Sequence, residues 1–436
     1  MIHRKKILLI IFVIYVIARI ALNLPALDKP RELADTTAYL RISREPIQNQ
    51  KFWGDARPFV FPLLLKISQQ DVSTAAAFHL GFSILAWGFL ALAISASFRA
   101  SYLTLFSFGL ILALSLIRHL ASWDYVMMTE SLSVTFFVLF LALGIWLTQR
   151  EVWRSYKVVL LIITAFFLAF TRDTNAYLLV MFAGMLTLAV IFRWTKLRAL
   201  ILVASFLVIF FINNYTADIG GRWIFPLNNI VGKRILPDTS ALEYFQSCGM
   251  PVTPELLALA DSFANGQDRA FYESPALNDY RAWLLENGKS CYLKYLLSNP
   301  IRSIADSLTR FDTLIRFDNL NKFFARKYDP VIPYYLEPLI YPVNFILPLW
   351  VVLTAISLLA VWKRAWESNP LWGITILLCL PTLLHLFITW HGDAMASERH
   401  ALSVGLQLAL CFWMTAFLIL EQFVARYLSR RSPSAT

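Results

Sequence analysis

Long apolar runs alternate with short polar connections along most of this chain. Ten runs approach the roughly 20 residues that an α-helix needs to cross a bilayer, at 6–24, 74–97, 101–121, 127–147, 157–171, 176–192, 198–215, 339–361, 370–390 and 400–424. The pattern predicts an all-α polytopic membrane protein with about ten transmembrane helices. The fifth and sixth runs are short and separated only by residues 171–175, so they are either two spans or a re-entrant pair.

The longest stretch without such a run covers residues 216–338 and follows the seventh run. Turn signals such as Gly220-Gly221 and Asn287-Gly288 surround helix-like segments there. We therefore expect a transmembrane module at 1–215 with about seven spans, a small helical subdomain on the outer face at 216–338, and a second module at 339–436 with about three spans. The first module includes an outer loop at 25–73, whose apolar segment after Pro58 is too short to span and predicts an amphipathic interfacial helix.

Basic residues favour one orientation of these runs. If the N-terminus is cytoplasmic, every inner connection carries Lys or Arg, and only Glu151 and Glu367 among them are acidic. This asymmetry follows the positive-inside rule and predicts cytoplasmic N- and C-termini. The opposite, non-cytoplasmic connections then hold most of the chemically versatile residues: Asp35, Arg57, Asp124, Arg172, Asp173, Asp393, Glu398, Arg399 and His400.

Composition agrees with a membrane location, which we expect to be the bacterial inner membrane. Hydrophobic residues make up 58% of the chain and charged residues 15%, whereas soluble domains carry about 25% charged residues. The net charge of +11 is spread over short groups between apolar runs, so we expect membrane lipids, and no nucleic acid, as partners. Cys248 and Cys291 share the long outer segment and could form a disulfide if it faces an oxidising compartment.

Asp35 is the first candidate for a catalytic base. It lies in the first outer loop, shortly after the first apolar run, in the sequence Asp35-Thr36-Thr37-Ala38-Tyr39. A groove between the loop helix and the spans would desolvate its carboxylate and raise its basicity. The alternative is a helix cap, in which the carboxylate accepts hydrogen bonds from the amides of Thr37 or Ala38.

Further polar residues at the outer ends of the spans are candidates for binding substrate or a lipid phosphate. Glu130 opens the fourth apolar run, where burial is costly unless the carboxylate is paired or functional; Arg118, Arg172 or Arg399 could be its partner. An outer arginine either binds a phosphate through its guanidinium or extends to the lipid headgroups. The candidates for substrate or phosphate binding are Tyr39, Arg57, Asp124, Glu130, Arg172, Glu398, Arg399 and His400.

Several kinds of chemistry find no motif in the sequence. His385 and His391 are six residues apart, and no Cys/His pair has zinc spacing. No Walker loop, GxGxxG or GxSxG is present, which counts against nucleotide-driven transport and serine-hydrolase chemistry. No cofactor is required by the pattern, although carboxylates near Asp35, Asp124 or Glu130 could hold Mg²⁺ or Mn²⁺.

Four segments together resemble the GT-C superfamily of integral-membrane glycosyltransferases, which includes dolichyl- and polyprenyl-phosphate-sugar dependent mannosyltransferases and aminoarabinose transferases. They are Asp35-x-x-x-Tyr39, Arg57-Pro58-x-x-x-Pro62-Leu63-Leu64, Thr129-Glu130-Ser131-Leu132 and Glu398-Arg399-His400. The match lies in their order and common sidedness. One departure is that the usual acidic neighbour of the loop aspartate is absent, because Ala34 and Thr36 flank Asp35.

The resemblance implies transfer of a sugar from a polyprenyl-phosphate donor to a glycan, lipid or protein acceptor on the non-cytoplasmic face. Asp35 would act on the acceptor hydroxyl, and the outer arginines would receive the lipid phosphate. One carboxylate suffices for a direct displacement, which inverts the anomeric centre. Two alternatives stay open: an outer-face polysaccharide polymerase or ligase that uses lipid-diphosphate glycans, and a lipid or glycan transporter, against which the scarcity of mid-span charges argues.

Overall fold

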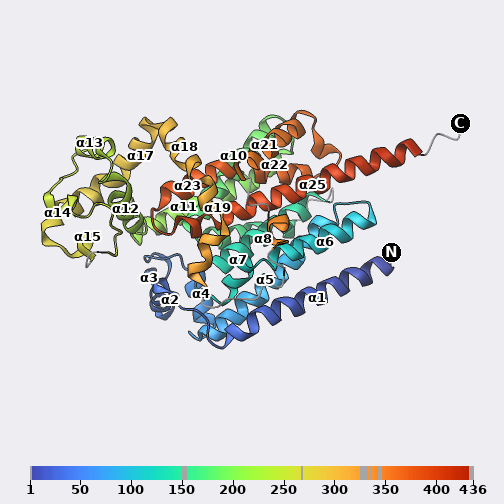
Figure 1. Ribbon diagram of the computed structural model, residues 1–436, viewed down its shortest axis with the longest axis horizontal. Coiled ribbons are helices and arrows are strands. Elements are labelled where there is room, and N and C mark those ends of the chain that lie inside the picture. Colours follow the sequence, from blue (N-terminus) through green and yellow to red (C-terminus); the bar gives the residue numbers. More distant parts are fainter. Residues whose placement is uncertain are drawn as a thin grey trace.

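The computed structural model describes residues 2–149, 155–266, 269–324, 332, 335–341 and 346–431. Within these residues the protein is helical, and its one β-feature is an isolated bridge between Arg31 and Val126. Long helices form a bundle, and a group of short helices, α12 to α17, covers one end of it (Figure 1). Helix α1 begins, and helix α25 ends, toward the opposite end of the bundle. The expected all-α architecture is confirmed for the described residues.

Seven helical segments among the described residues are long and apolar enough to cross a membrane, so the chain is an integral membrane protein. They are α1 (Ile2–Leu27), α5 (Val72–Ser95), α8 (Glu130–Thr148), α10 (Asp173–Ile191), α11 (Leu200–Ile219) with the preceding turn, α22 (Leu371–Cys379) continued by α23 (Thr382–Gly392), and α25 (Leu402–Arg431). An eighth would be α6 (Ser101–Ser115) joined to α7 (Arg118–Ala121) and η1 (Ser122–Tyr125), but the chain bends there by 62°.

The expectation of ten spans is not confirmed. Helices α9 (Ser155–Ala169) and α21 (Ile346–Trp362), which correspond to the expected fifth and eighth spans, are shorter than the seven. The path of the chain nevertheless favours separate passes for α9 and α10 over a re-entrant pair. Thr148 and Lys196 line one cavity at one end of the bundle, and Arg172 lines another at the opposite end, so α9 connects the two ends.

Helix α1 packs loosely at the edge of the bundle. Leu9 and Ile14 are each 62% exposed, as suits side chains that face lipid. The inner side of the helix carries Arg19, a buried residue whose guanidinium donates to Asp124 Oδ2 at 2.5 Å and to Ser83 Oγ at 2.6 Å. This ion pair connects α1 to η1 inside the bundle.

The loop between α1 and α5 folds into α2 (Ala34–Arg44), α3 (Gln50–Trp53) and α4 (Val60–Ile67). The short helix expected after Pro58 therefore forms. Five of the eight residues of α4 are buried, and Phe61 packs edge-on against Tyr39 of α2 with ring centroids 5.0 Å apart. The apolar side of α4 thus packs against the rest of the protein. The sequence predicted instead that this helix lies along the membrane interface.

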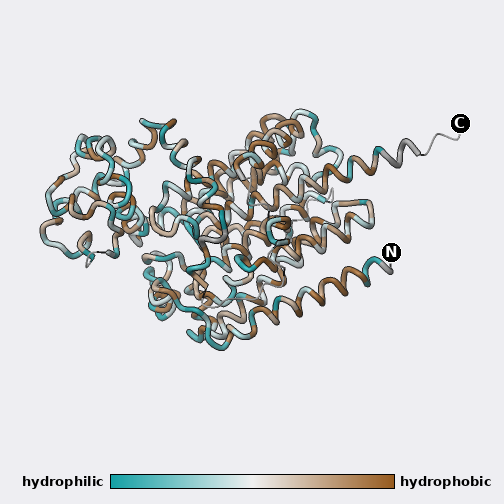
Figure 2. The backbone as a smooth tube through the Cα atoms, viewed as in Figure 1, coloured by the Kyte–Doolittle hydropathy of each residue, from teal (hydrophilic) through white to brown (hydrophobic). Residues whose placement is uncertain are grey.

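The long segment after α11 has its own hydrophobic cluster, which includes Phe245, Tyr280 and Trp283. Its helical segments are α12 (Ile224–Ile230), η3 (Val231–Ile235), α13 (Thr239–Ser247), α14 (Pro254–Leu257), α15 (Ala270–Glu273), η5 (Pro275–Leu277), α16 (Asn278–Trp283), η6 (Leu284–Gly288) and α17 (Lys289–Ser298). Cys248 and Cys291, 43 residues apart, form a disulfide between the end of α13 and α17. These helices are more hydrophilic than the apolar bundle beside them (Figure 2).

Three further short helices, α18 (Pro300–Thr309), α19 (Phe311–Ile315) and η7 (Phe317–Phe323), lead from this subdomain back to the bundle. Helix α20 (Glu337–Ile340) precedes α21, and η8 (Ala365–Glu367) follows it. Helix α24 (Ser397–His400) lies between the last two long segments and places its side chains at the same end of the bundle as α2.

Candidate functional site

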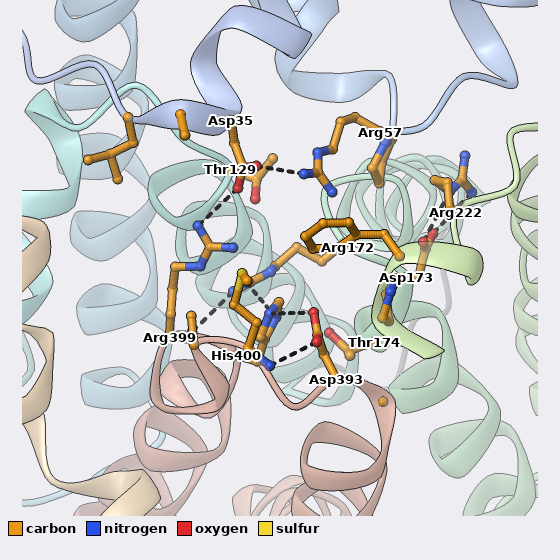
Figure 3. A pocket seen from close by; sticks show the side chains of 18 of the residues that line it. Asp35, Arg57, Thr129, Arg172, Asp173, Thr174, Arg222, Asp393, Arg399 and His400 are labelled. Carbon is orange, nitrogen blue, oxygen red and sulfur yellow. Dashed lines mark hydrogen bonds and ion pairs between the residues drawn. The ribbon is translucent and has the colours of Figure 1, made fainter. Parts of the chain in front are cut away.

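A cavity of about 640 Å³ lies where the outer-loop helices, the end of the bundle and the subdomain meet. Its volume is within the range of small-molecule pockets, about 300–1,000 Å³. The elements that line it are far apart in sequence: α2, the loop before α4, the turn between α9 and α10, the chain around α12, and the chain from α23 to α24. Figure 3 shows their polar side chains converging on one space.

Asp35 lies between two arginines in this cavity. Arg57 donates from Nη2 to Oδ1 at 2.6 Å, and Arg399 donates from Nη1 to Oδ2 at 3.3 Å (Figure 3). Burial by itself would raise the pKa of Asp35, but the charges of Arg57 and Arg399 outweigh it, so the pKa is lowered. The expected increase in the basicity of Asp35 is therefore wrong for this arrangement of side chains.

The helix-cap alternative for Asp35 is also not what the structure has. Leu33 is the N-cap residue of α2, and its own N–H donates to Thr36 Oγ1 at 2.9 Å. Asp35 lies in the first turn, where the partial positive charge of a helix N-terminus favours a carboxylate. Its carboxylate oxygens accept hydrogen bonds from Arg57 and Arg399 instead.

Glu130 lies behind the cavity wall and holds two arginines in place. It is fully buried at the start of α8, and its Oε1 lies 3.3 Å from Arg172 Nη2 and 3.1 Å from Arg399 Nε. Within the described part of the chain, neither oxygen has a well-aligned hydrogen-bond donor, so the contacts are ion pairs. Two of the three expected partners are thus found at Glu130. The charges alternate from Arg57 through Asp35, Arg399 and Glu130 to Arg172, which fixes the guanidiniums before any ligand binds.

His400 and Asp393 form a second polar group in the cavity. Arg172 Nη2 lies 2.7 Å from His400 Nδ1, and because arginine only donates, Nδ1 is the acceptor and Nε2 carries the proton. Burial first, and then the neighbouring arginines, lower the pKa of His400 well below its ordinary value, so the ring is neutral. Its Nε2 lies 3.8 Å from Asp393 Oδ2.

Asp393 differs from Asp35 in its electrostatic surroundings. Its Oδ1 accepts from Asn229 Nδ2 and from the Met395 backbone, both at 2.9 Å. Burial raises the pKa of Asp393, and these hydrogen bonds only partly oppose that shift. The cavity therefore holds two carboxyl groups whose pKa values are shifted in opposite directions.

The structure brings together six of the nine residues selected from the sequence. Asp35, Tyr39, Arg57, Arg172, Arg399 and His400 line the cavity. Glu130 does not line the cavity but contacts the lining residue Arg172, and Glu398 pairs with the cavity residue Lys322. Asp124 does not contribute, because it is buried inside the bundle and pairs with Arg19.

Four of the described charged residues that line the cavity are not among the nine residues selected from the sequence. Asp173 and Arg222 form an ion pair at 3.0 Å in the wall, and Asp393 and Lys322 also line it. Asp173 and Asp393 lie in the outer connections beside selected residues, so their position was a usable signal. Arg222 and Lys322 lie in the long outer segment, where no periodic pattern separates them from its other basic residues.

The donor set around Asp35 suits an anion better than a metal ion. Of the described residues that line the cavity, five are Lys or Arg and three are Asp. Among the described residues, no group of three or more His, Cys, Asp and Glu side chains could hold a metal. Arginines occupy the carboxylate oxygens of Asp35, Asp124 and Glu130 that Mg²⁺ or Mn²⁺ would need. These residues do not fit the Mg²⁺ or Mn²⁺ that the sequence alone leaves possible.

The cavity therefore combines preorganised guanidiniums, two carboxyl groups of different basicity and a neutral histidine with a known tautomer. Arginine in this arrangement binds phosphate oxygens through two parallel N–H groups. Comparison of the chain with protein-family models and with curated protein sequences gives no match, so the function has to be inferred from this geometry.

Proposed function

We propose that the protein is a glycosyltransferase that moves a sugar from a polyprenyl-phosphate donor to a glycan, lipid or protein acceptor on the non-cytoplasmic face of the membrane. The observation that carries this proposal is the row of Arg57, Arg399 and Arg172 around Asp35, in a cavity at one end of a transmembrane bundle. A lipid-linked phosphate matches that position, because its chain can remain among the spans while its charge reaches the arginines.

The proposed reaction is a direct displacement at the anomeric carbon. The acceptor oxygen forms a bond to that carbon while the bond to the phosphate oxygen breaks, and the electron pair leaves with the lipid phosphate. Asp35 takes the proton from the acceptor hydroxyl, and the guanidiniums stabilise the charge that develops on the departing phosphate. No second carboxylate is required as a nucleophile, so the anomeric configuration is inverted.

Donor binding would also change the basicity of Asp35. The charges of Arg57 and Arg399 lower its pKa. A phosphate that accepts hydrogen bonds from these arginines competes with Asp35 for them and adds negative charge nearby. Both effects raise the pKa of the carboxyl group, so Asp35 becomes a stronger base only when the donor is present.

The subdomain supplies the part of the cavity wall that suits the transferred sugar and acceptor. Phe225, Phe263 and Asn265 line the cavity from this side. Apolar walls with a few placed amide groups are typical of small-molecule sites. The separation of an arginine-rich wall from an aromatic and amide wall supports one subsite for the phosphate and another for the sugar.

The direct test is an assay of the purified protein with a panel of polyprenyl-phosphate sugars and candidate acceptors. We expect release of polyprenyl monophosphate with at least one donor, together with a product of inverted configuration. Release of polyprenyl diphosphate would instead identify the polymerase or ligase alternative. No release with any donor, while the protein moves intact lipid across reconstituted vesicles, would contradict the proposal in favour of a transporter.

A further inference from the structure

A second cavity, of about 590 Å³, lies at the other end of the bundle and plays no part in the proposed reaction. Helices α8, α9, α10, α11 and α22 line it, together with the connection between α10 and α11. Helix α10 separates the two cavities: it begins at Asp173 in the first one and has 19 residues, a length of about 28 Å. The second cavity therefore opens at the opposite membrane face.

The wall of this cavity is apolar from its basic end to the middle of the bilayer. Phe140, Phe182 and Phe206 each lie near the middle of their helices, and Phe140 contacts the other two rings at 5.7 Å between centroids. Leucines from the surrounding helices, together with Ile374, form most of the remaining wall. The depth of the cavity therefore corresponds to one leaflet, which is about half of the roughly 30 Å hydrocarbon core.

Positive charge marks the open end. Lys196 and Arg198 line the cavity there and are both exposed, and the adjacent Trp194 is an aromatic residue of the kind enriched at membrane interfaces. A basic residue next to the inner leaflet attracts anionic lipid by about 1 kcal/mol. The cavity therefore combines an apolar chain site with a cationic headgroup site at one membrane boundary.

A glycine keeps the cavity open. Among the described residues, a Cβ added at Gly144 of α8, in the cavity wall, would have one neighbour within 4 Å, Ile374 Cδ1 at 3.8 Å. A larger side chain at this position would enter the cavity. By contrast, a Cβ at the exposed Gly184 of α10 would meet no described residue within 4 Å, and Gly184 is not part of the wall.

We propose that this second cavity binds one anionic phospholipid of the cytoplasmic leaflet, with an acyl chain against Phe140, Phe182 and Phe206 and the phosphate at Lys196 and Arg198. The wall reaches only mid-bilayer, which suits the acyl chain of one leaflet. A polyprenyl chain has several times as many carbon atoms and would not be contained. This site is independent of the proposed transferase reaction, since it lies at the other membrane face.

The test measures phospholipid bound to the purified full-length protein by native mass spectrometry, after exchange into detergent with either phosphatidylglycerol or phosphatidylcholine. Wild type should retain about one phosphatidylglycerol per chain and prefer it to phosphatidylcholine. Gly144→Phe should lose this lipid, whereas the matched variant Gly184→Phe should retain it. Replacing both basic residues (Lys196→Gln with Arg198→Gln) should lower the preference for phosphatidylglycerol roughly 30-fold.

Three results would overturn the site. They are equal retention of phosphatidylglycerol in Gly144→Phe and Gly184→Phe, no preference of wild type for the anionic lipid, and displacement of the bound phospholipid by an equimolar amount of polyprenyl phosphate. If Gly144→Phe does not fold, the double basic-residue variant decides, because it leaves the apolar wall unchanged. An unchanged lipid preference in that variant would then count against the proposal.

Discussion

At the scale of single residues, the two carboxyl groups of the cavity make different predictions about the base. Asp35→Asn should lower sugar transfer by about 10²–10⁴-fold, the usual contribution of a general base, while donor binding is kept because Arg57 and Arg399 remain. Asp393→Asn should lower transfer less than tenfold. Asp55→Asn is the matched control, since Asp55 pairs with the exposed Arg41 in the same outer loop but does not line the cavity.

The pH dependence of the same reaction separates the two carboxyl groups without mutation. A base must be deprotonated, so activity falls as the pH drops through its pKa. The pKa of Asp35 in the free protein is lowered from 3.8, so kcat/KM should stay constant down to that pH, whereas the raised pKa of Asp393 would move the fall above it. The fall in kcat should occur at higher pH than the fall in kcat/KM, because the bound phosphate takes the arginines from Asp35. A fall in kcat/KM that begins above pH 3.8, or a larger loss in Asp393→Asn than in Asp35→Asn, would assign the base to Asp393.

Single residues also differ in how far the sequence could predict their place in the site. Outer loops between apolar runs located Asp35, Arg57, Arg172 and Arg399, because sidedness depends only on charge pattern and span length. The pattern could not show that Asp124 turns into the bundle, because that depends on its contact with Arg19 from a different helix. The pattern also could not show that the pKa of Asp35 is lowered. The direction of that shift depends on Arg57 and Arg399, which lie next to Asp35 only in the folded chain.

At the scale of helices, the Arg19–Asp124 pair gives a prediction about the attachment of α1. Removing one partner of a buried ion pair leaves an uncompensated charge, so Arg19→Leu should reduce the free energy of unfolding by about 3–5 kcal/mol. The double variant with Asp124→Leu should recover most of that loss, because apolar partners often replace a buried pair at little cost. Unfolding in detergent measures both.

The control for this pair is the exposed contact between Lys289 and Asp218, where Asp218→Asn should cost at most about 1 kcal/mol. If the Arg19→Leu and Asp124→Leu losses simply add in the double variant, the pair does not act as a coupled unit.

The lengths of the helices could be predicted from the sequence only in part. Hydropathy identified ten apolar runs, but where each helix ends depends on turns and packing, as in the bend between α6 and α7.

At the scale of the whole molecule, the positions of the chain ends constrain the number of membrane crossings. Helix α1 begins and α25 ends toward the same end of the bundle (Figure 1). A chain whose two ends lie on one side of a membrane crosses it an even number of times, so we expect a crossing besides the seven long apolar segments. The candidates for this crossing are the bent pair, α9 and α21.

The same geometry predicts that the subdomain and the α10–α11 connection lie on opposite sides of the membrane. Glu255 of α14 and Arg193 after α10 are both exposed, so a cysteine at either position is accessible to a maleimide. In intact cells, a membrane-impermeant maleimide should label Glu255→Cys, and Arg193→Cys should react only after permeabilisation. The native thiols give little background, since Cys379 and Cys411 are buried and Cys248 is joined to Cys291, a disulfide that itself suits an oxidising, non-cytoplasmic compartment. Labelling of Arg193→Cys in intact cells would reverse the orientation and place the arginine-rich cavity in the cytoplasm.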